Sequence, residues 1–215
     1  MFLIFTNKLA QAVSFLVHPL IIPTIIYILL AIFRPDLVLP FTADNITFLI
    51  VTVAFFSFVI PAILIVSLFY FKKISTLLLD NQDDRQKALV ATSIVYMLAI
   101  YVLHVVLRLN NVGVSIFGYI TFCIILAMII TKYWKISLHC IGAAGLVIFC
   151  AYIAYDSYQY LSFVIFLFSV ILSGFLASAR LHLNKHSLAQ VAAGYFLGLV
   201  VGFVFLSYQQ LYLAR

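Results

Sequence analysis

Charged residues are scarce in this chain, and their scarcity argues against a soluble fold. Only 8% of the 215 residues are Asp, Glu, Lys or Arg, whereas 67% are hydrophobic and the mean hydropathy is +1.25. Apolar runs of about 20 residues follow one another, and each is long enough to cross about 30 Å of hydrocarbon. We therefore expect an all-α integral membrane protein, a bundle of about six to seven transmembrane helices.

Cysteine is also rare. The three cysteines, Cys123, Cys140 and Cys150, all lie within apolar runs. Their odd number and apolar setting argue against a disulfide framework and against a thiolate metal cluster. We expect all three to be small buried hydrophobic residues.

Targeting, linker and repeat signals are missing as well. Residues 1–8 lack a basic leader followed by a small-residue cleavage site, so we do not expect a removed signal peptide. No low-complexity linker or internal repeat divides the chain. The expected organisation is a single transmembrane domain over residues 1–215.

Seven apolar runs are candidate membrane spans. Pro19, Pro23 and Pro61 lie within the first two and should kink them, which a membrane helix tolerates when neighbours satisfy the freed carbonyls. The runs cover residues 9–33, 46–70, 89–108, 112–131, 136–155, 158–178 and 186–207.

The order of these spans places three polar clusters on one membrane face. Two spans separate the loop with Arg85 and Lys87 from the junction 132–139, and two more separate that junction from residues 180–186. That face, with the N-terminus, carries nine of the 12 Lys and Arg residues, which favours the cytoplasmic side. Cations retained to bind an anionic substrate would raise the same count, so the side of the membrane stays open.

Residues 179–194 combine cations and histidines at the start of the last apolar run. Arg180 and Lys185 supply donors for phosphate or carboxylate oxygens, and an imidazole such as that of His186 can shuttle protons or attack as a nucleophile. If the last helix begins near Lys185, then His186 and Gln190 stand four apart on one helical face, where the amide can orient the imidazole. Backbone N–H groups at that helix start also favour an anion.

These residues resemble the signatures of the type 2 phosphatidic acid phosphatase superfamily. The third signature, Ser-Arg-x5-His-x3-Asp-Val-x2-Gly, is similar to Ala179-Arg180-x5-His186-x3-Gln190-Val191-x2-Gly194. The second, Pro-Ser-Gly-His, is similar to Ile136-Ser137-Leu138-His139 and keeps the serine and the histidine. The first, Lys-x6-Arg-Pro, is absent in strict form, with Arg85 and Lys87 as displaced stand-ins. The resemblance covers residues 80–207.

The resemblance implies a phosphatase or phosphotransferase that acts on a lipid phosphate such as phosphatidic acid, phosphatidylglycerophosphate or an isoprenyl pyrophosphate. His186 would be the nucleophile, His139 the acid for the leaving oxygen, and Gln190 the residue that orients His186. The phosphate would be held by Arg180, Ser137, Arg85, Lys87 and Lys135. The resemblance implies no metal ion and no cofactor. Gln190 replaces a carboxylate, and a comparable amide replacement in a serine-protease triad costs about 10⁴ in rate.

Other functions remain open at this point. A catalytically silent relative would bind lipid phosphates or serve as a subunit of a membrane assembly. A metal enzyme would use His182 and His186, spaced four apart on one helix, with His139 as a third ligand. A transporter is the remaining class.

The expected partners are membrane lipids and a lipid-phosphate substrate, with no nucleic acid, because basic residues at the bilayer edges account for the charge of +6. Protein partners are not indicated. The expected location is the bacterial inner membrane.

The remaining polar residues have structural expectations. Glycines at every fourth position from 194 to 202 predict a face for close helix packing. His18 and His104 are expected to have structural or packing roles. The acidic residues at positions 80, 83 and 84 predict a solvated patch, with a further chance of holding Arg85 or Lys87.

Overall fold

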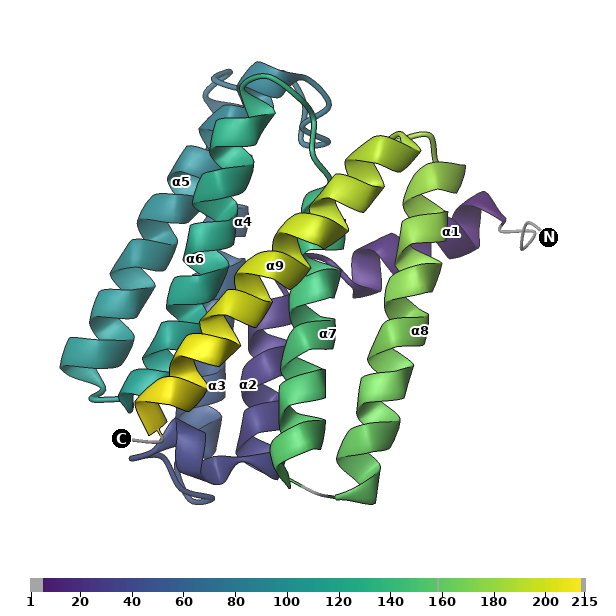
Figure 1. Ribbon diagram of the computed structural model, residues 1–215. Helices are drawn as coiled ribbons and strands as arrows, with labels where there is room; N and C mark the ends of the chain where they lie inside the picture. The colour runs from purple at the N-terminus through teal and green to yellow at the C-terminus, as the bar shows by residue number, and fades with distance from the viewer. Residues whose placement is uncertain (1–5, 158, 214–215) are drawn as a thin grey trace. The chain divides into compact units, whose positions relative to one another are not determined.

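The computed structural model describes residues 6–157 and 159–213, and every regular element in these ranges is helical (Figure 1). The expected leader-free start at residues 1–5 and the cation Arg215 lie outside the described residues. The elements are α1 (Asn7–Leu16), α2 (Ile22–Phe33), η1 (Pro35–Val38), α3 (Ile46–Ala54), η2 (Phe55–Val59), α4 (Ile60–Tyr70), α5 (Gln82–Tyr101), η3 (Val102–Val106), α6 (Asn111–Thr131), α7 (Leu138–Ser157), α8 (Tyr160–His182) and α9 (Leu188–Leu213).

Within the described residues, six segments are long and apolar enough to cross a membrane. The first segment continues from α3 into α4 through the π-helical turn η2, and the second consists of α5 and the π-helical turn η3 that ends it. The chain is therefore an all-α membrane protein, as its composition predicts. The six segments are Ile46–Tyr70, Gln82–Val106, Asn111–Thr131, Leu138–Ser157, Tyr160–His182 and Leu188–Tyr208.

The expected span over residues 9–33 is wrong. Two shorter helices, α1 and α2, replace it, and the chain between them turns through a hydrogen bond from the Ile21 N–H to the His18 carbonyl at 2.9 Å. Pro19 explains the break, since it lacks an N–H and disfavours helical geometry at the residue before it. Pro23 is tolerated because it lies in the first turn of α2. Without this span, the count of crossings no longer fixes the side of the N-terminus.

The chain divides into two compact units. Unit 1 comprises Met1–Ile22 and Ile136–Arg215, and therefore contains α1, α7, α8 and α9. Unit 2 comprises Pro23–Lys135 and contains the helices from α2 through α6, apart from the first residue of α2.

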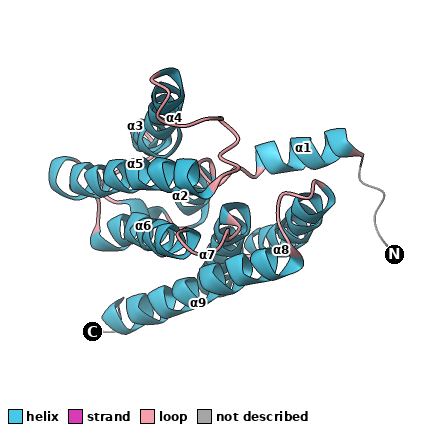
Figure 2. Ribbon diagram, turned by 90° about the horizontal axis from the view of Figure 1, so that it is seen from above, coloured by secondary structure: helices cyan, strands magenta, loops and turns pink. Residues whose placement is uncertain are grey.

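Unit 2 is organised around α5, which lies between α4 and α6 (Figure 2). The fully buried ring of Tyr96 on α5 packs against Phe117 on α6, with ring centroids 5.0 Å apart. The Tyr27 hydroxyl on α2 donates to the Gly113 carbonyl at 2.6 Å. Aromatic rings with a polar tip thus fill the core and also supply its hydrogen bonds.

Pro61 leaves one carbonyl of its own helix without a helical donor, and a neighbouring helix supplies the replacement. A proline at position 61 cannot donate to the Ser57 carbonyl four residues earlier. The Tyr96 hydroxyl donates to that carbonyl at 3.0 Å. The Ser57 hydroxyl lies 3.1 Å from the Thr24 hydroxyl. The expectation that a neighbour would satisfy a carbonyl freed by proline is confirmed here.

Unit 1 packs α8 and α9 against α7, and α1 runs across the end of α8 that carries Ala179 (Figures 1 and 2). The glycine ladder of α9 faces α7. A Cβ added at Gly194 or Gly198 would lie 2.6 Å from the carbonyl oxygen of Ser137 or Ile141, respectively. The glycines therefore permit a close approach of two backbones, and their predicted packing role is confirmed.

We predict that Tyr96→Phe lowers the free energy of unfolding by about 1–3 kcal/mol, because it leaves the buried Ser57 carbonyl without its donor. Thermal or denaturant unfolding in a mild detergent measures this loss. Tyr101→Phe is the matched control, since Tyr101 lies on the same helix with 56% of its surface exposed. Equal stability of the two variants would contradict the role given to the Tyr96 hydroxyl.

Candidate functional site

The turn between α8 and α9 is fixed by backbone hydrogen bonds. The Lys185 N–H donates to the Arg180 carbonyl at 3.2 Å, and the Asn184 N–H donates to the Leu181 carbonyl at 3.0 Å. Asn184 has φ 52°, the left-handed conformation that asparagine tolerates after a helix end. This Schellman motif ends α8 and sets where the residues after Arg180 begin the next helix.

A capping box starts α9. The Gln190 N–H donates to the Ser187 hydroxyl at 3.4 Å, and the Ser187 N–H donates to the Gln190 Oε1 at 3.1 Å. Ser187 is therefore the residue before the helix, and α9 begins at Leu188 rather than near Lys185. His186 thus precedes the helix, and the expectation of a shared helical face with Gln190 is wrong.

The Gln190 side chain nevertheless orients His186. The His186 Nδ1 lies 3.2 Å from the Gln190 Oε1. The Ser187 N–H can only donate, so the amide atom facing it is the oxygen, and the His186 Nδ1 must carry the proton that it shares with this oxygen. When the ring is neutral, its lone pair therefore lies on Nε2. His186 itself is only 8% exposed.

The start of α7 lies against the start of α9. The Ser137 N–H donates to the Gln190 backbone carbonyl at 3.3 Å, and the close approach at Gly194 holds the two helices together beside it. The fully buried Ser137 hydroxyl donates to the Cys140 Sγ at 3.2 Å. Its oxygen lone pairs and its rotating proton are the groups that it can offer to a ligand.

His139 lies beside the same cations and histidines. Its imidazole hydrogen-bonds to the backbone of Ser14, and Arg180, His18 and His186 are all near enough to act on it electrostatically. The rings of His139 and His18 meet edge to face, with centroids 5.3 Å apart and planes at 83°. Unit 1 therefore brings together three imidazoles and one guanidinium.

His18 was expected to have a structural or packing role, and its position next to His139 was not predicted. The Leu20 N–H donates to the His18 Nδ1 at 3.3 Å, which leaves the ring proton on Nε2. Burial, and secondarily the positive charge of Arg180, lower the pKa of His18 below its usual value near 6.5. His18 is consequently neutral at pH 7.

The acidic residues of unit 1 give this cluster little negative charge. Asp156 is the single Asp or Glu within residues 1–22 and 136–215. It stands next to last in α7, whereas His139 is second, and a helix of 20 residues is about 30 Å long.

The remaining predicted phosphate ligands belong to unit 2, where local contacts hold them. The Lys87 ammonium lies 2.6 Å from the Asp83 carboxylate, one helical turn earlier. Lys135 donates to the Asp80 carbonyl at 3.2 Å and lies 3.7 Å from its carboxylate. Arg85 is 5% exposed. The expectation that an acidic residue could hold Lys87 in place is confirmed for Asp83.

Asp84 does not belong to a solvated patch, because it is only 4% exposed. Its Oδ2 accepts hydrogen bonds from the Ser75 N–H, the Ser75 hydroxyl and the Asn81 amide, at 2.7, 2.6 and 2.8 Å. The Asn81 side chain in turn caps α5 by accepting from the Asp84 N–H at 2.7 Å. This carboxylate ties the loop before α5 to the helix.

The hypothesis of a metal site assumed that His182 and His186 lie four apart on one helix, and the structure does not have this geometry. His182 ends α8 and the chain turns at Asn184, so His182 and His186 do not lie on one helix. The His182 Nε2 instead lies 3.0 Å from the Asn7 side-chain oxygen at the start of α1. Across the part of the chain that the structure describes, no three His, Cys, Asp or Glu side chains are grouped to hold a metal ion.

Two residues of the site, Ser187 and His18, were not predicted from the sequence. Ser187 was readable, because Ser187-Leu-Ala-Gln190 fits the capping-box pattern S-x-x-Q. His18 carried no such signal, since its contact with His139 depends on how the turn after α1 lies against α7. Comparisons with protein-family models, with curated proteins and with solved structures gave no match for this chain.

We predict that His18 makes the stability of the protein fall under mild acid. Its pKa is lowered in the folded state, so its contribution is fully present above the unfolded value near 6.5 and is lost as the pH falls through the folded value. The melting temperature should therefore drop less between pH 7.5 and pH 5.5 in His18→Gln than in the wild type.

The control for this prediction is His104→Gln, which replaces an exposed histidine in unit 2. That variant should follow the wild-type curve. An unchanged acid response of His18→Gln would show that His18 does not contribute.

Proposed function

We propose that this chain is a membrane-embedded, metal-independent phosphatase or phosphotransferase that acts on a lipid phosphate through a phosphohistidine. The observation that carries the proposal is the cluster of Arg180, His139 and His186 in one unit, with the His186 proton held on Nδ1 by Gln190. Phosphatidic acid, phosphatidylglycerophosphate and isoprenyl pyrophosphates are the substrates that we propose. The proposed location is the bacterial inner membrane.

In the first step, the lone pair of the His186 Nε2 attacks phosphorus and the bond from phosphorus to the lipid oxygen breaks. His139 in its protonated form gives its proton to that leaving oxygen. Arg180 holds phosphate oxygens through its guanidinium, and Ser137 turns its hydroxyl proton from the Cys140 Sγ to the phosphate. The start of α9 immediately after His186 adds backbone N–H groups that favour the anion.

In the second step, water attacks phosphorus, the bond from phosphorus to His186 breaks, and His139 accepts a proton from the water. A hydroxyl group of a second lipid in place of water would make the same sequence a phosphotransfer. While phosphorus is bonded to its Nε2, the His186 ring is more positive than the free neutral ring, and the Gln190 oxygen then accepts the Nδ1 proton more strongly. The neutral amide stabilises this charge less than a carboxylate would.

The proposal predicts that purified protein releases phosphate from these lipids in the presence of a chelator. His186→Ala should slow release by about 10³-fold or more, because it removes the nucleophile. Labelled lipid phosphate should also leave an acid-labile label on the wild type and none on the variant.

His182→Ala is the matched control, since His182 is an exposed histidine bonded to Asn7. It should retain the wild-type rate. Undiminished phosphate release from His186→Ala would remove the proposed nucleophile, and loss of activity on chelation would move the reaction to metal chemistry.

One observation favours a second candidate, a catalytically silent protein that binds lipid phosphates. Gln190 is neutral, and its oxygen already accepts the Ser187 N–H of the capping box. A cluster of Arg180 and imidazoles binds a phosphate anion whether or not the histidine is activated for attack.

Gln190→Glu separates the two candidates, because it keeps the reach of the side chain and adds the negative charge. We expect phosphate release to rise about tenfold or more, toward the roughly 10⁴ that an equivalent charge is worth in a serine-protease triad. Gln11→Glu, at an exposed position on α1, controls for added charge alone. Activity that appears only in Gln190→Glu would identify the wild type as the silent binder.

A further inference from the structure

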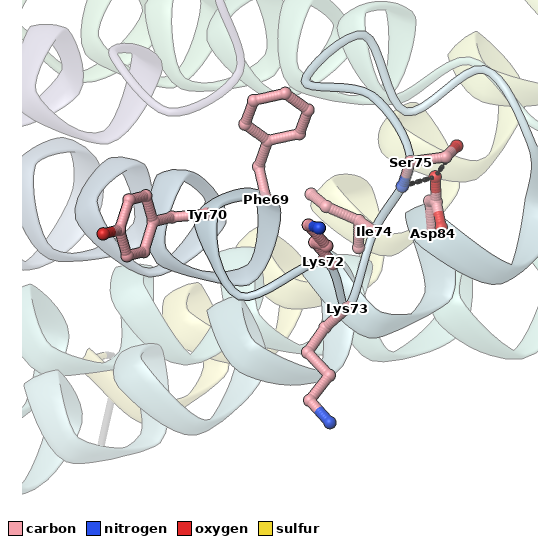
Figure 3. Close-up of a pocket in the computed structure, with 7 residues that line it drawn as sticks. All are labelled: Phe69, Tyr70, Lys72, Lys73, Ile74, Ser75 and Asp84. Carbon is pink, nitrogen blue, oxygen red and sulfur yellow. Dashed lines mark hydrogen bonds between the residues drawn. The ribbon is translucent and has the colours of Figure 1, made fainter.

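Unit 2 contains a pocket of about 590 Å³ between the end of α4 and the start of α5 (Figure 3). Its apolar wall comes from Phe69, Tyr70 and Ile74, and Asp84 closes the side toward α5. Residues 46–70 form a membrane span, so the pocket begins where that span ends. Its depth therefore corresponds to the headgroup layer of a bilayer.

The backbone around the pocket is held by internal hydrogen bonds. Lys72 has φ 56°, and the next N–H, that of Lys73, donates to the Leu68 carbonyl at 2.8 Å. The Lys87 ammonium donates to the Lys73 carbonyl at 3.0 Å. The buried Asp84 binds both donors of Ser75. None of these contacts uses the side-chain charge of Lys72 or Lys73.

The two lysines face the pocket in different ways. In Figure 3 the Lys72 side chain is seen nearly end-on beside Ile74, whereas the Phe69 ring, Tyr70 and Lys73 extend away in other directions. Within the described residues, neither the Lys72 nor the Lys73 ammonium has a hydrogen-bond or ion-pair partner. The pocket thus combines an apolar wall with two ammonium groups that bind no other side chain among the described residues. The carboxylate of Asp84 does not pair with them, since its Oδ2 already accepts three hydrogen bonds.

We infer that this pocket binds the headgroup of an anionic membrane phospholipid, with its phosphate against Lys72 and Lys73. The glycerol and first acyl carbons would lie along Phe69 and Ile74, and the chains would continue beside α4. That helix exposes Ile63 and Val66 to 57% and 53%, as a lipid-facing surface does. Lysine supplies a point charge suited to a headgroup phosphate, and cations next to a span attract anionic lipid.

This inference is independent of the proposed reaction, because it uses no residue of unit 1. A membrane lipid accounts for both the cations and the apolar wall, whereas a soluble phosphate would use only the cations. The two sources of phosphate can be separated by experiment.

The test measures lipid retention by native mass spectrometry of the purified protein in mild detergent, with phosphatidylglycerol, phosphatidylcholine or inorganic phosphate added. The wild type should bind phosphatidylglycerol about tenfold more tightly than phosphatidylcholine. The double variant Lys72→Gln, Lys73→Gln should lose that preference, and Lys72→Arg, Lys73→Arg should keep it. Lys132→Gln, at an exposed lysine just after α6, is the matched control and should bind as the wild type does.

Three results would overturn the inference: equal binding of the two lipids by the wild type, an undiminished preference in the double glutamine variant, or displacement of the lipid by millimolar inorganic phosphate. Phosphate release by the double glutamine variant is measured in parallel. It should equal the wild-type rate, so a failure of the lipid site and a failure of the proposed reaction give different patterns.

Discussion

Every backbone polar group in an apolar environment must find a partner within the protein, and this constraint governs the structure at each point where a helix is interrupted. Pro61 frees the Ser57 carbonyl, and the Tyr96 hydroxyl from α5 takes the missing place. At the junction of α8 and α9, a Schellman motif and a capping box satisfy the exposed carbonyls and N–H groups in turn. The proposed site lies at this junction, where the polar groups of the turn and of the helix start are concentrated.

A single oxygen illustrates how structural and chemical roles become combined. The Gln190 Oε1 accepts the Ser187 N–H, which helps to begin α9, and it also receives the His186 Nδ1 proton. Because the first contact fixes which end of the amide faces the histidine, the helix cap determines the tautomer. The lone pair of His186 on Nε2 is thus a consequence of helix initiation.

Much of the fold could be predicted from the sequence, because long apolar runs and proline positions report directly on helices in lipid. Six spans and the packing role of the Gly194 ladder follow from such local patterns. The break before α2 was missed because residues 17–21 are as apolar as a continuous span, and only the backbone limits of Pro19 mark it. The buried position of Asp84 was missed because a charged loop predicts exposure unless its hydrogen-bond donors are known.

The candidate site likewise has contacts that the sequence predicted and contacts that it did not. The spacing from Arg180 to Gln190 indicated the contact of His186 with the amide, although the helix begins later than expected. His18 and His139 are neighbours because the turn after α1 lies against α7, which no local pattern encodes. Sequence spacing thus predicts contacts within one turn of the chain, whereas contacts between distant helices require their packing.

The absence of a Cβ at Gly194 has a consequence for chemistry as well as for packing. A single added carbon would lie 2.6 Å from the Ser137 carbonyl, so α9 would have to move away from α7. Such a displacement would stretch the bond from the Ser137 N–H to the Gln190 carbonyl and would shift His186 relative to His139. The spacing between His186 and His139, the proposed nucleophile and acid, therefore depends on the missing Cβ, and an added methyl group at this position would change that spacing without changing any polar group of the candidate site.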